Sequence, residues 1–297
     1  MLVAMADNSP GPVRHHRLKL PQGSLFWHEA GRGDAVLFLH GTWQDSSQWY
    51  GLLQQLAPNF HCIAPDLLGF GESSAAQSSY SVALEVESLA TLLTRLRVQR
   101  VYLVGHSLGA WVALALAQRY PDRVHGVLAI DPEGFEPPVL GHRWALDRWL
   151  VAPWSPLTWG LWAMSPLLQR FKPEGWLLRL RQRRQRLCHA PAATQLLFRR
   201  RRPEILSELA SARPAPLAVP LVVLESAQAS AVAHHLTHAC LQTFPQAHHQ
   251  IVPAADNALG LKPEAVAEAL VELAAAQNPF TPDRAPSSHR PQPVVSG

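Results

Sequence analysis

The sequence predicts an α/β protein with a mostly parallel central sheet, flanking helices and a helical insertion. Short apolar runs alternate with helix-period runs over residues 14–131, and the alternation resumes over residues 217–277. The segment between them, residues 132–216, loses this rhythm and is divided by prolines into short helices. Such alternation is typical of a parallel sheet, whose ligand sites lie at the carboxyl ends of the strands. We therefore expect one core in two sequence pieces, with residues 132–216 as a lid.

The composition indicates a soluble globular protein that needs no cofactor. The chain has 297 residues, 47% of them hydrophobic, which is enough for one large α/β domain with an insertion. We find no apolar stretch long enough to cross a membrane and no signal-peptide pattern at the start, so we expect a cytoplasmic protein. The three cysteines are scattered, and no metal-ligand cluster or phosphate-binding glycine loop is present. These features predict no metal, no nucleotide and no haem.

The first strands follow a start that we expect to be mobile, residues 1–13. Two short strands, His15–Leu20 and Ser24–Glu29, are predicted on either side of a Pro-Gln-Gly turn. Ala35–Leu39 is wholly apolar, as expected of a strand in the centre of a sheet.

A turn that can bind a developing negative charge follows this third strand. It reads His40-Gly41-Thr42-Trp43, and its glycine allows a substrate to approach the backbone closely. We expect the backbone N–H of Thr42 to be one half of an oxyanion hole. An ordinary turn between strand and helix is the alternative, since His and Gly are common in turns.

The next elements carry turn and cap signals rather than chemistry. Asp45 is expected to cap a helix that runs to about Leu56, and a strand is predicted at His61–Ala64. Asp66 then opens a D-x-x-G-x-G-x-S loop that its carboxylate is expected to brace through backbone hydrogen bonds. Ser81 begins a helix that runs through Leu96.

A strand, a tight turn and a helix over residues 100–120 place a serine at a sharp bend. The strand Val101–Val104 runs into Gly105-His106-Ser107-Leu108-Gly109, and an apolar helix is predicted just after Gly109. This pattern fits G-x-S-x-G, in which the serine is exposed as a nucleophile and the glycines allow strand and helix to pass closely. We expect the N–H of Leu108 to be the second oxyanion donor, and a chance turn is the alternative. Residues around the serine that we expect in the substrate pocket are His40, Gly41, Trp43 and His106.

Four motifs in this order resemble the α/β-hydrolase superfamily. They read H-G-T-W, D-L-L-G-F-G-E-S, V-G-H-S-L-G and P-D-R-V-H-G-V-L-A-I-D, and the last ends at Asp131. The resemblance covers about residues 14–131 and resumes over residues 220–273. It is greatest to the single-lid group of esterases, carbon–carbon bond hydrolases, haloperoxidases, epoxide hydrolases and haloalkane dehalogenases. The last two use an aspartate at the bend, so Ser107 argues against both.

The resemblance also shows that an expected carboxylate is missing. In most relatives the strand equivalent to Pro220–Glu225 leads into a loop with the catalytic aspartate, but here Ser226–Ser230 contains no acid. Some relatives place the acid after the preceding strand, where this chain has Asp131. We therefore expect Asp131 to be the orienting acid, and the alternative is that it caps the turn before Pro132.

The catalytic histidine of the family is also missing. The family's spacing back from Pro263 reaches Asp256 instead of histidine. A serine hydroxyl needs a base with a pKa near the operating pH, and an ordinary carboxylate is a much weaker base. Two alternatives stay open: Asp131 and Asp256 approach each other and repulsion raises one pKa, or a histidine such as His234 reaches the serine. The other histidines nearby are read as surface or packing residues: His235, His238, His248 and His249.

The lid is rich in tryptophan and arginine. It contains six of the ten tryptophans, and its 14 Lys and Arg against 6 Asp and Glu give a net charge of +8. The tryptophans could line an apolar pocket below a solvated basic helix. The alternative is peripheral contact with an anionic membrane, where tryptophan lies at the headgroups and arginine meets phosphate, or contact with a protein.

Two functions follow from these residues. The first is a serine hydrolase acting on an ester or thioester of an apolar compound, with Ser107, Asp131 and Asp256 at its centre. The second is a catalytically impaired relative that binds an apolar ligand, a membrane surface or a protein. Nucleic-acid binding is not expected, because the basic lid carries no nucleic-acid motif.

Overall fold

The computed structural model describes residues 12–75, 80–135, 137–152, 159–160, 163, 175–199, 217–255 and 260–277. The start that we expect to be mobile lies mainly outside these ranges. Asp256 and residues 278–297, a C-terminal tail whose prolines and serines predict disorder, lie wholly outside them. Within the described ranges, no helix is both long enough and apolar enough to span a membrane.

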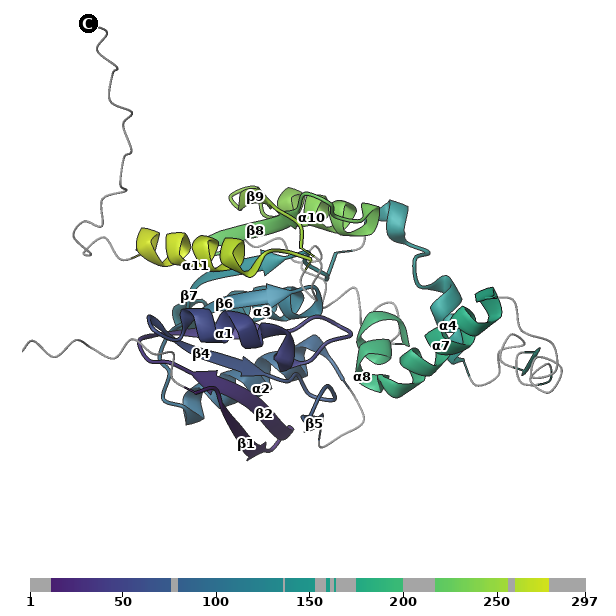
Figure 1. Ribbon diagram of the computed structural model, residues 1–297, viewed down its shortest axis with the longest axis horizontal. Helices are drawn as coiled ribbons and strands as arrows, with labels where there is room; N and C mark the ends of the chain where they lie inside the picture. Colours follow the sequence, from purple (N-terminus) through teal and green to yellow (C-terminus); the bar gives the residue numbers. More distant parts are fainter. Residues whose placement is uncertain are drawn as a thin grey trace, which may run out of the picture.

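The core is a nine-stranded, mostly parallel sheet (Figure 1), and a mostly parallel sheet is what the sequence predicts. Its order is β1-β2-β4-β3-β6-β7-β8-β9, with β5 paired to β2. The pairs from β4 through β3, β6, β7 and β8 to β9 are parallel, and those made by β2 are antiparallel. The strands are β1 Arg14–Leu20, β2 Gly23–Ala30, β3 Asp34–Leu39, β4 Phe60–Pro65, β5 Ser74–Ala75, β6 Val101–His106, β7 Val124–Ile130, β8 Leu221–Ser226 and β9 His248–Val252.

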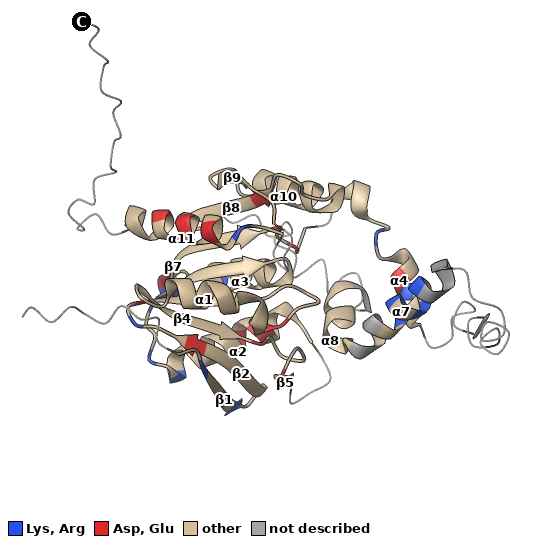
Figure 2. Cartoon of the chain, viewed as in Figure 1, with Lys and Arg blue, Asp and Glu red and all other residues tan. Residues whose placement is uncertain are grey.

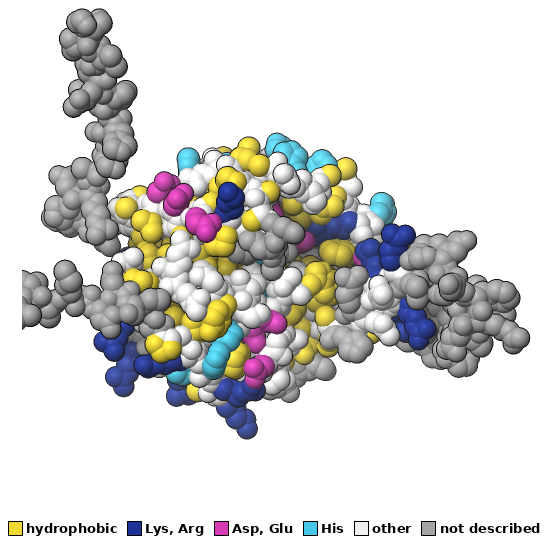
Figure 3. All heavy atoms as spheres, viewed as in Figure 1, with side chains coloured by type: hydrophobic (Ala, Val, Ile, Leu, Met, Phe, Trp, Pro, Cys, Tyr) yellow, Lys and Arg dark blue, Asp and Glu magenta, His cyan; other side chains and the backbone are white. Residues whose placement is uncertain are grey.

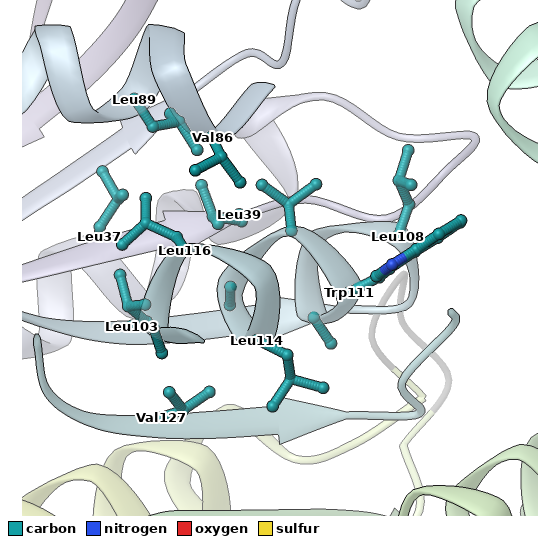
Figure 4. Close-up of a cluster of buried hydrophobic side chains, with 14 of the residues drawn as sticks. Leu37, Leu39, Val86, Leu89, Leu103, Leu108, Trp111, Leu114, Leu116 and Val127 are labelled. Atoms are coloured by element: carbon teal, nitrogen blue, oxygen red, sulfur yellow. The ribbon is translucent and has the colours of Figure 1, made fainter. Parts of the chain in front are cut away.

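Helices cover both faces of this sheet. One hydrophobic cluster joins the sheet to α2, α3 and α10, and part of it is drawn in Figure 4 around Trp111 and Leu114. The other cluster joins the opposite face to α1 and α11. The helices of the core are α1 Tyr50–Leu56, α2 Val82–Arg95, α3 Leu108–Arg119, α10 Ala231–Thr243 and α11 Pro263–Gln277.

The cap signals in the sequence are confirmed, and one helix boundary is corrected. The Asp45 carboxylate accepts the Ser47 N–H at 2.9 Å, and the Ser81 hydroxyl accepts the Leu84 N–H at 3.0 Å. The helix expected just after Gly109 starts at Leu108. Gly109 therefore belongs to the helix rather than to the turn. A glycine is needed there because α3 approaches β3 too closely to leave room for a Cβ.

The described part of residues 132–216, the expected lid, contains two short helices and one longer helix of 15 residues at one end of the core (Figure 1). They are α4 Ala145–Val151, α7 Gly175–His189 and α8 Pro191–Thr194. Figure 2 shows Lys and Arg residues, in blue, along α7. Helices α4 and α7 are joined by Arg183, which donates to both carboxylate oxygens of the buried Asp147 at 2.6 and 2.8 Å.

Candidate active site

Ser107 lies at a sharp bend between β6 and α3. Its backbone has φ 53° and ψ −114°, a conformation that L residues other than glycine rarely adopt. Hydrogen bonds fix the bend to the end of β7: the Ser107 N–H donates to the Ile130 carbonyl at 2.9 Å, and the Ser107 carbonyl accepts the Glu133 N–H at 3.1 Å. The strained backbone is thus held by neighbouring strands, as expected for a nucleophile that must project from a turn.

The two glycines around Ser107 are required by packing. A Cβ on Gly105 would lie 2.5 Å from the Gly109 carbonyl oxygen, and a Cβ on Gly109 would lie 2.2 Å from the Leu39 carbonyl oxygen. Both neighbours are backbone atoms that cannot move aside cheaply. The glycine pattern in the sequence therefore reflects real backbone contacts among β3, β6 and α3.

The turn after β3 comes close to Ser107. The Gly41 carbonyl accepts the Gln44 N–H at 3.1 Å and closes the turn, and the Thr42 hydroxyl oxygen lies 3.5 Å from the Ser107 hydroxyl oxygen. Leu108 is the first residue of α3, so its N–H has no acceptor inside the helix. This arrangement is compatible with the oxyanion donors expected at Thr42 and Leu108. The Thr42 hydroxyl is a further polar group beside Ser107 that the sequence motif does not single out.

His40 does not have the expected place in a substrate pocket. Its side chain is fully buried, its Nε2 accepts the Leu67 N–H at 2.9 Å, and its Nδ1 lies 2.9 Å from the Gly41 carbonyl. Burial lowers the pKa of His40. The neutral imidazole connects the turn after β3 to the loop after β4. The prediction that His40 lines the substrate pocket is therefore wrong.

Asp66 braces its loop as the sequence predicts. One carboxylate oxygen accepts the Ser46 N–H at 2.7 Å, and the other accepts the Glu72 N–H at 2.7 Å. Asp66 therefore connects the loop after β4 to the segment that follows the turn after β3.

A cavity of about 250 Å³ brings most of the predicted site together. Ser107 and Asp131 reach it from the ends of β6 and β7, and the first turns of α10 form another wall. Its lining contains the predicted Gly41, Thr42, Trp43, His106, Ser107 and Asp131, together with Gln44, Glu133, Ser230, Val232, Ala233 and Leu236. Asp256 lies outside the described residues, so its predicted role stays a prediction.

Asp131 is held in an unusual environment. Its backbone has φ 44°, and its Oδ1 atom is buried without a hydrogen-bond partner among the described residues. Burial, followed by the nearby charge of Glu225, raises the pKa of Asp131 to about 6. The sequence-based alternative, in which a second carboxylate raises the pKa of the first, thus has a counterpart in the structure, with Glu225 rather than Asp256 as the described second carboxylate.

The described imidazoles near the cavity are poorly suited to act as the base for Ser107. Burial, with a contribution from His40, lowers the pKa of His106 to about 4, so it is a weaker base than Asp131. On α10, Val232, Ala233 and Leu236 line the cavity, and helical geometry places His234 on the opposite side of that helix. His234 instead contacts Glu225, which makes it an unfavourable direct base for Ser107.

A second, larger cavity of about 650 Å³ adjoins the first and lies between the core and the lid. The two share Thr42, Trp43 and Gln44. The large cavity adds aromatic and apolar walls, and the Arg183–Asp147 ion pair contributes to its lining. Its other lining residues are Asp45, Gly69, Phe70, Gly71, Trp144, Leu187 and Ala190.

Two acidic residues near Ser107 were missed by the sequence analysis. Glu133 lines the small cavity and forms an ion pair with Arg143. Glu225 is buried at the end of β8 and contacts His234 and His249. Only the pairing of β7 with β8 brings Glu225 near Asp131, and this long-range pairing leaves no local signal in the sequence.

The comparisons with known proteins agree with the fold. The family model of the alpha/beta hydrolase fold matches residues 34–263. The structure of haloalkane dehalogenase DbeA from Bradyrhizobium elkani USDA94 superposes with a TM-score of 0.65 at 22% identity, covering 91% of this chain and 100% of that one. At that identity, the likeness supports the fold alone.

Sequence relatives match a shorter part of the chain. A haloalkane dehalogenase of Bradyrhizobium diazoefficiens is 36% identical over 122 residues, which are 40% of this chain and 39% of the relative. The pimeloyl-[acyl-carrier protein] methyl ester esterase of Aeromonas salmonicida is 36% identical over 101 residues, which are 34% of this chain and 38% of the relative. Across the most similar curated relatives, the aligned part spans 31% to 45% of the relative's length.

Proposed function

Since this chain belongs to the alpha/beta hydrolase fold family, we propose that it is a serine hydrolase that cleaves an ester or thioester of an apolar compound. The observation that carries the proposal is Ser107, held at a strained bend in one cavity with Asp131. A serine in this position supports an ester hydrolase rather than a dehalogenase, because the resemblance gives dehalogenases an aspartate at the bend.

Asp131 acts in this proposal as the general base rather than as the orienting acid expected from the sequence. With its pKa raised to about 6, Asp131 is still ionised at pH 7.5 and is a stronger base than an ordinary aspartate. It takes the Ser107 proton as the hydroxyl oxygen attacks the carbonyl carbon, and the protonated carboxyl then donates that proton to the leaving group. Water, deprotonated by the same carboxylate, then attacks the acyl carbon. As the bond from that carbon to the Ser107 oxygen breaks, the Asp131 carboxyl donates its proton to this oxygen, which releases the acid and regenerates Ser107.

The developing oxyanion is bound by groups from two elements. The N–H groups of Thr42 and Leu108, with the Thr42 hydroxyl 3.5 Å from the Ser107 hydroxyl, supply donors on one side of the reacting carbon. Such donors act without rearrangement, because the turn at Gly41 and the start of α3 are already fixed by backbone hydrogen bonds.

The larger cavity supports an apolar substrate. It opens from the Thr42–Gln44 turn toward Phe70 and Trp144, and a volume of about 650 Å³ accommodates a drug-sized group. Because the Arg183 guanidinium is already paired with Asp147, this wall is not a free cationic site for an acidic substrate.

A fluorophosphonate probe tests the proposal directly. We expect covalent labelling at Ser107 that is lost in Ser107→Ala, and hydrolysis of p-nitrophenyl esters that falls by about 10²- to 10⁴-fold in Asp131→Asn. Labelling of the wild type at other residues only, or ester turnover that persists in Ser107→Ala, would contradict the assignment of the nucleophile.

A catalytically impaired relative that binds an apolar ligand is the second candidate. The observation in its favour is that the imidazole lining the small cavity, His106, has its pKa lowered to about 4. This candidate predicts no labelling in the wild type and labelling in Asp256→His. Turnover that depends on Ser107 rules it out.

A further inference from the structure

Glu225 is a buried carboxylate behind the catalytic cavity with both oxygens occupied. It lies near the end of β8 and is 5% exposed. Its Oε1 is 2.7 Å from Nδ1 of His234 on α10, and its Oε2 is 2.9 Å from Nε2 of His249 on β9. None of these three residues has a role in the hydrolysis proposed for Ser107 and Asp131.

The sheet places Glu225 beside Asp131. Strands β7 and β8 are parallel, and the last residues in their register are Ile130 opposite Leu224. Asp131 directly follows the last residue of β7, and Glu225 follows Leu224 on β8, so the two carboxylates lie at the carboxyl ends of neighbouring parallel strands. This juxtaposition puts a second carboxylate near the one that lines the Ser107 cavity.

We propose that Glu225 is a positioning residue for hydrolysis at Ser107: held between His234 and His249, its negative charge keeps Asp131 suited to accept the serine proton. The inference rests on the proposed function, because it assigns a role to Glu225 only if Asp131 is the base. Glu225 itself touches no substrate in this role and acts through Asp131.

The two imidazoles explain how a buried acid can carry this charge. A carboxylate removed from water is destabilised unless hydrogen-bond donors satisfy its oxygens. His234 and His249 supply one donor each, and both side chains are partly exposed, at 61% and 32%. The imidazoles therefore connect the buried charge to solvent on the side away from Ser107.

The other ionisable groups around the pair do not supply the same charge. Glu133 lines the cavity, but its carboxylate is paired with the Arg143 guanidinium. His106 on β6 lines the cavity and is neutral at pH 7, since its pKa is lowered to about 4. On α10, His235 and His238 contact the His234 ring, with centroids at 6.2 and 6.5 Å. Among these described groups, Glu225 is the acid whose charge acts on Asp131.

Glu225→Gln tests the inference, because it removes the charge and keeps the shape. The titration midpoint of the Asp131 carboxyl is followed by carbon-13 NMR in protein labelled at aspartate, with Asp131→Asn used for assignment. We expect the midpoint to fall by on the order of one pH unit, and the acidic limb of the kcat/KM profile to move to lower pH by the same amount. The control Glu268→Gln, at an exposed carboxylate on α11, should change neither the Asp131 midpoint nor the kcat/KM profile.

A second variant guards against loss of folding in Glu225→Gln. His234→Ala removes, from a largely exposed position, one of the two imidazoles that hold the Glu225 carboxylate in place, so the Asp131 midpoint should fall by less than in Glu225→Gln. His235→Ala, at an exposed neighbour on α10, is the matched control.

The outcomes separate this inference from the proposed function. An unchanged Asp131 midpoint in folded Glu225→Gln overturns the role of Glu225, whatever the turnover. A shifted midpoint in a protein that hydrolyses no ester contradicts the proposed function but supports the electrostatic link. A shifted midpoint with a shifted kcat/KM profile supports both.

Discussion

Asp131 destabilises the folded protein at neutral pH. Its pKa rises from an ordinary value near 4 to about 6 on folding, mainly through burial, so the folded state favours the protonated form. The resulting penalty is fully present above about pH 6, decreases between pH 6 and pH 4, and disappears at lower pH. The backbone of Asp131, at φ 44°, adds strain at the same residue.

Asp131→Asn should therefore lose activity and gain stability. We expect the free energy of unfolding to increase by about 1–3 kcal/mol at pH 8, and the gain to vanish near pH 4. Urea unfolding of both proteins across this pH range measures it. A variant that is less stable than the wild type at pH 8 would show that the Asp131 carboxylate is stabilised in the folded state.

The sequence predicts residues well where the signal is local. The bend at Ser107, the brace at Asp66 and the caps at Asp45 and Ser81 all depend on neighbours within a few residues or on a strong turn pattern. His40 was misjudged because the sequence places it beside Gly41 but does not show that its ring is buried. Glu225 was missed because its relation to Asp131 depends on strand pairing between residues almost a hundred positions apart.

At the scale of elements, the contact of α3 with β3 depends on the absence of a side chain at residue 109. Gly109→Ala would place a Cβ 2.2 Å from the Leu39 carbonyl oxygen, so α3 must move away from the sheet. We expect a loss of at least about 3 kcal/mol in unfolding free energy, or failure to fold, together with loss of labelling at Ser107.

Gly51→Ala on α1 is the matched control. Nothing lies within 4 Å of a Cβ at this exposed helical position, and alanine there should stabilise the protein by about 0.5–1 kcal/mol. Thermal unfolding of both variants tests this comparison. Equal changes in stability for Gly109→Ala and Gly51→Ala would mean that helix propensity, rather than close packing against β3, determines the effect at residue 109.

The strands and helices for which the sequence gives bounds agree with the structure to within about two residues, because apolar periodicity reports directly on burial. The sequence predicts the start of α3 too late, because the G-x-S-x-G pattern makes Gly109 look like a turn residue. In the structure it is a helical residue whose missing Cβ permits packing. A glycine at a contact between elements and a glycine at a turn cannot be distinguished from one sequence.

At the scale of the whole molecule, the lid presents apolar and cationic groups together. Among its described residues, Leu146 and Trp149 of α4 are 45% and 54% exposed, and Arg179 and Arg181 of the neighbouring α7 are exposed. Figure 3 shows Lys and Arg side chains on the surface at this end of the molecule. Peripheral contact with an anionic membrane therefore stays a prediction for the lid.

Vesicle co-sedimentation tests that contact. We expect the protein to sediment with anionic vesicles more than with neutral ones, with weaker binding at high salt and in Trp149→Glu. Val271→Glu, at an exposed apolar residue on α11, should leave sedimentation unchanged. Equal sedimentation with both kinds of vesicle would favour the alternative in which the tryptophans serve only the cavity.

The order of the strands has a consequence for biosynthesis. Strand β7 pairs with β6 on one side and with β8 on the other, and β8 follows only after the whole lid. While the ribosome translates that insertion, the outer edge of β7 is unpaired and open to aggregation. The nascent chain thus exposes an apolar strand edge until the roughly 90 residues between Ile130 and Leu221 have been added.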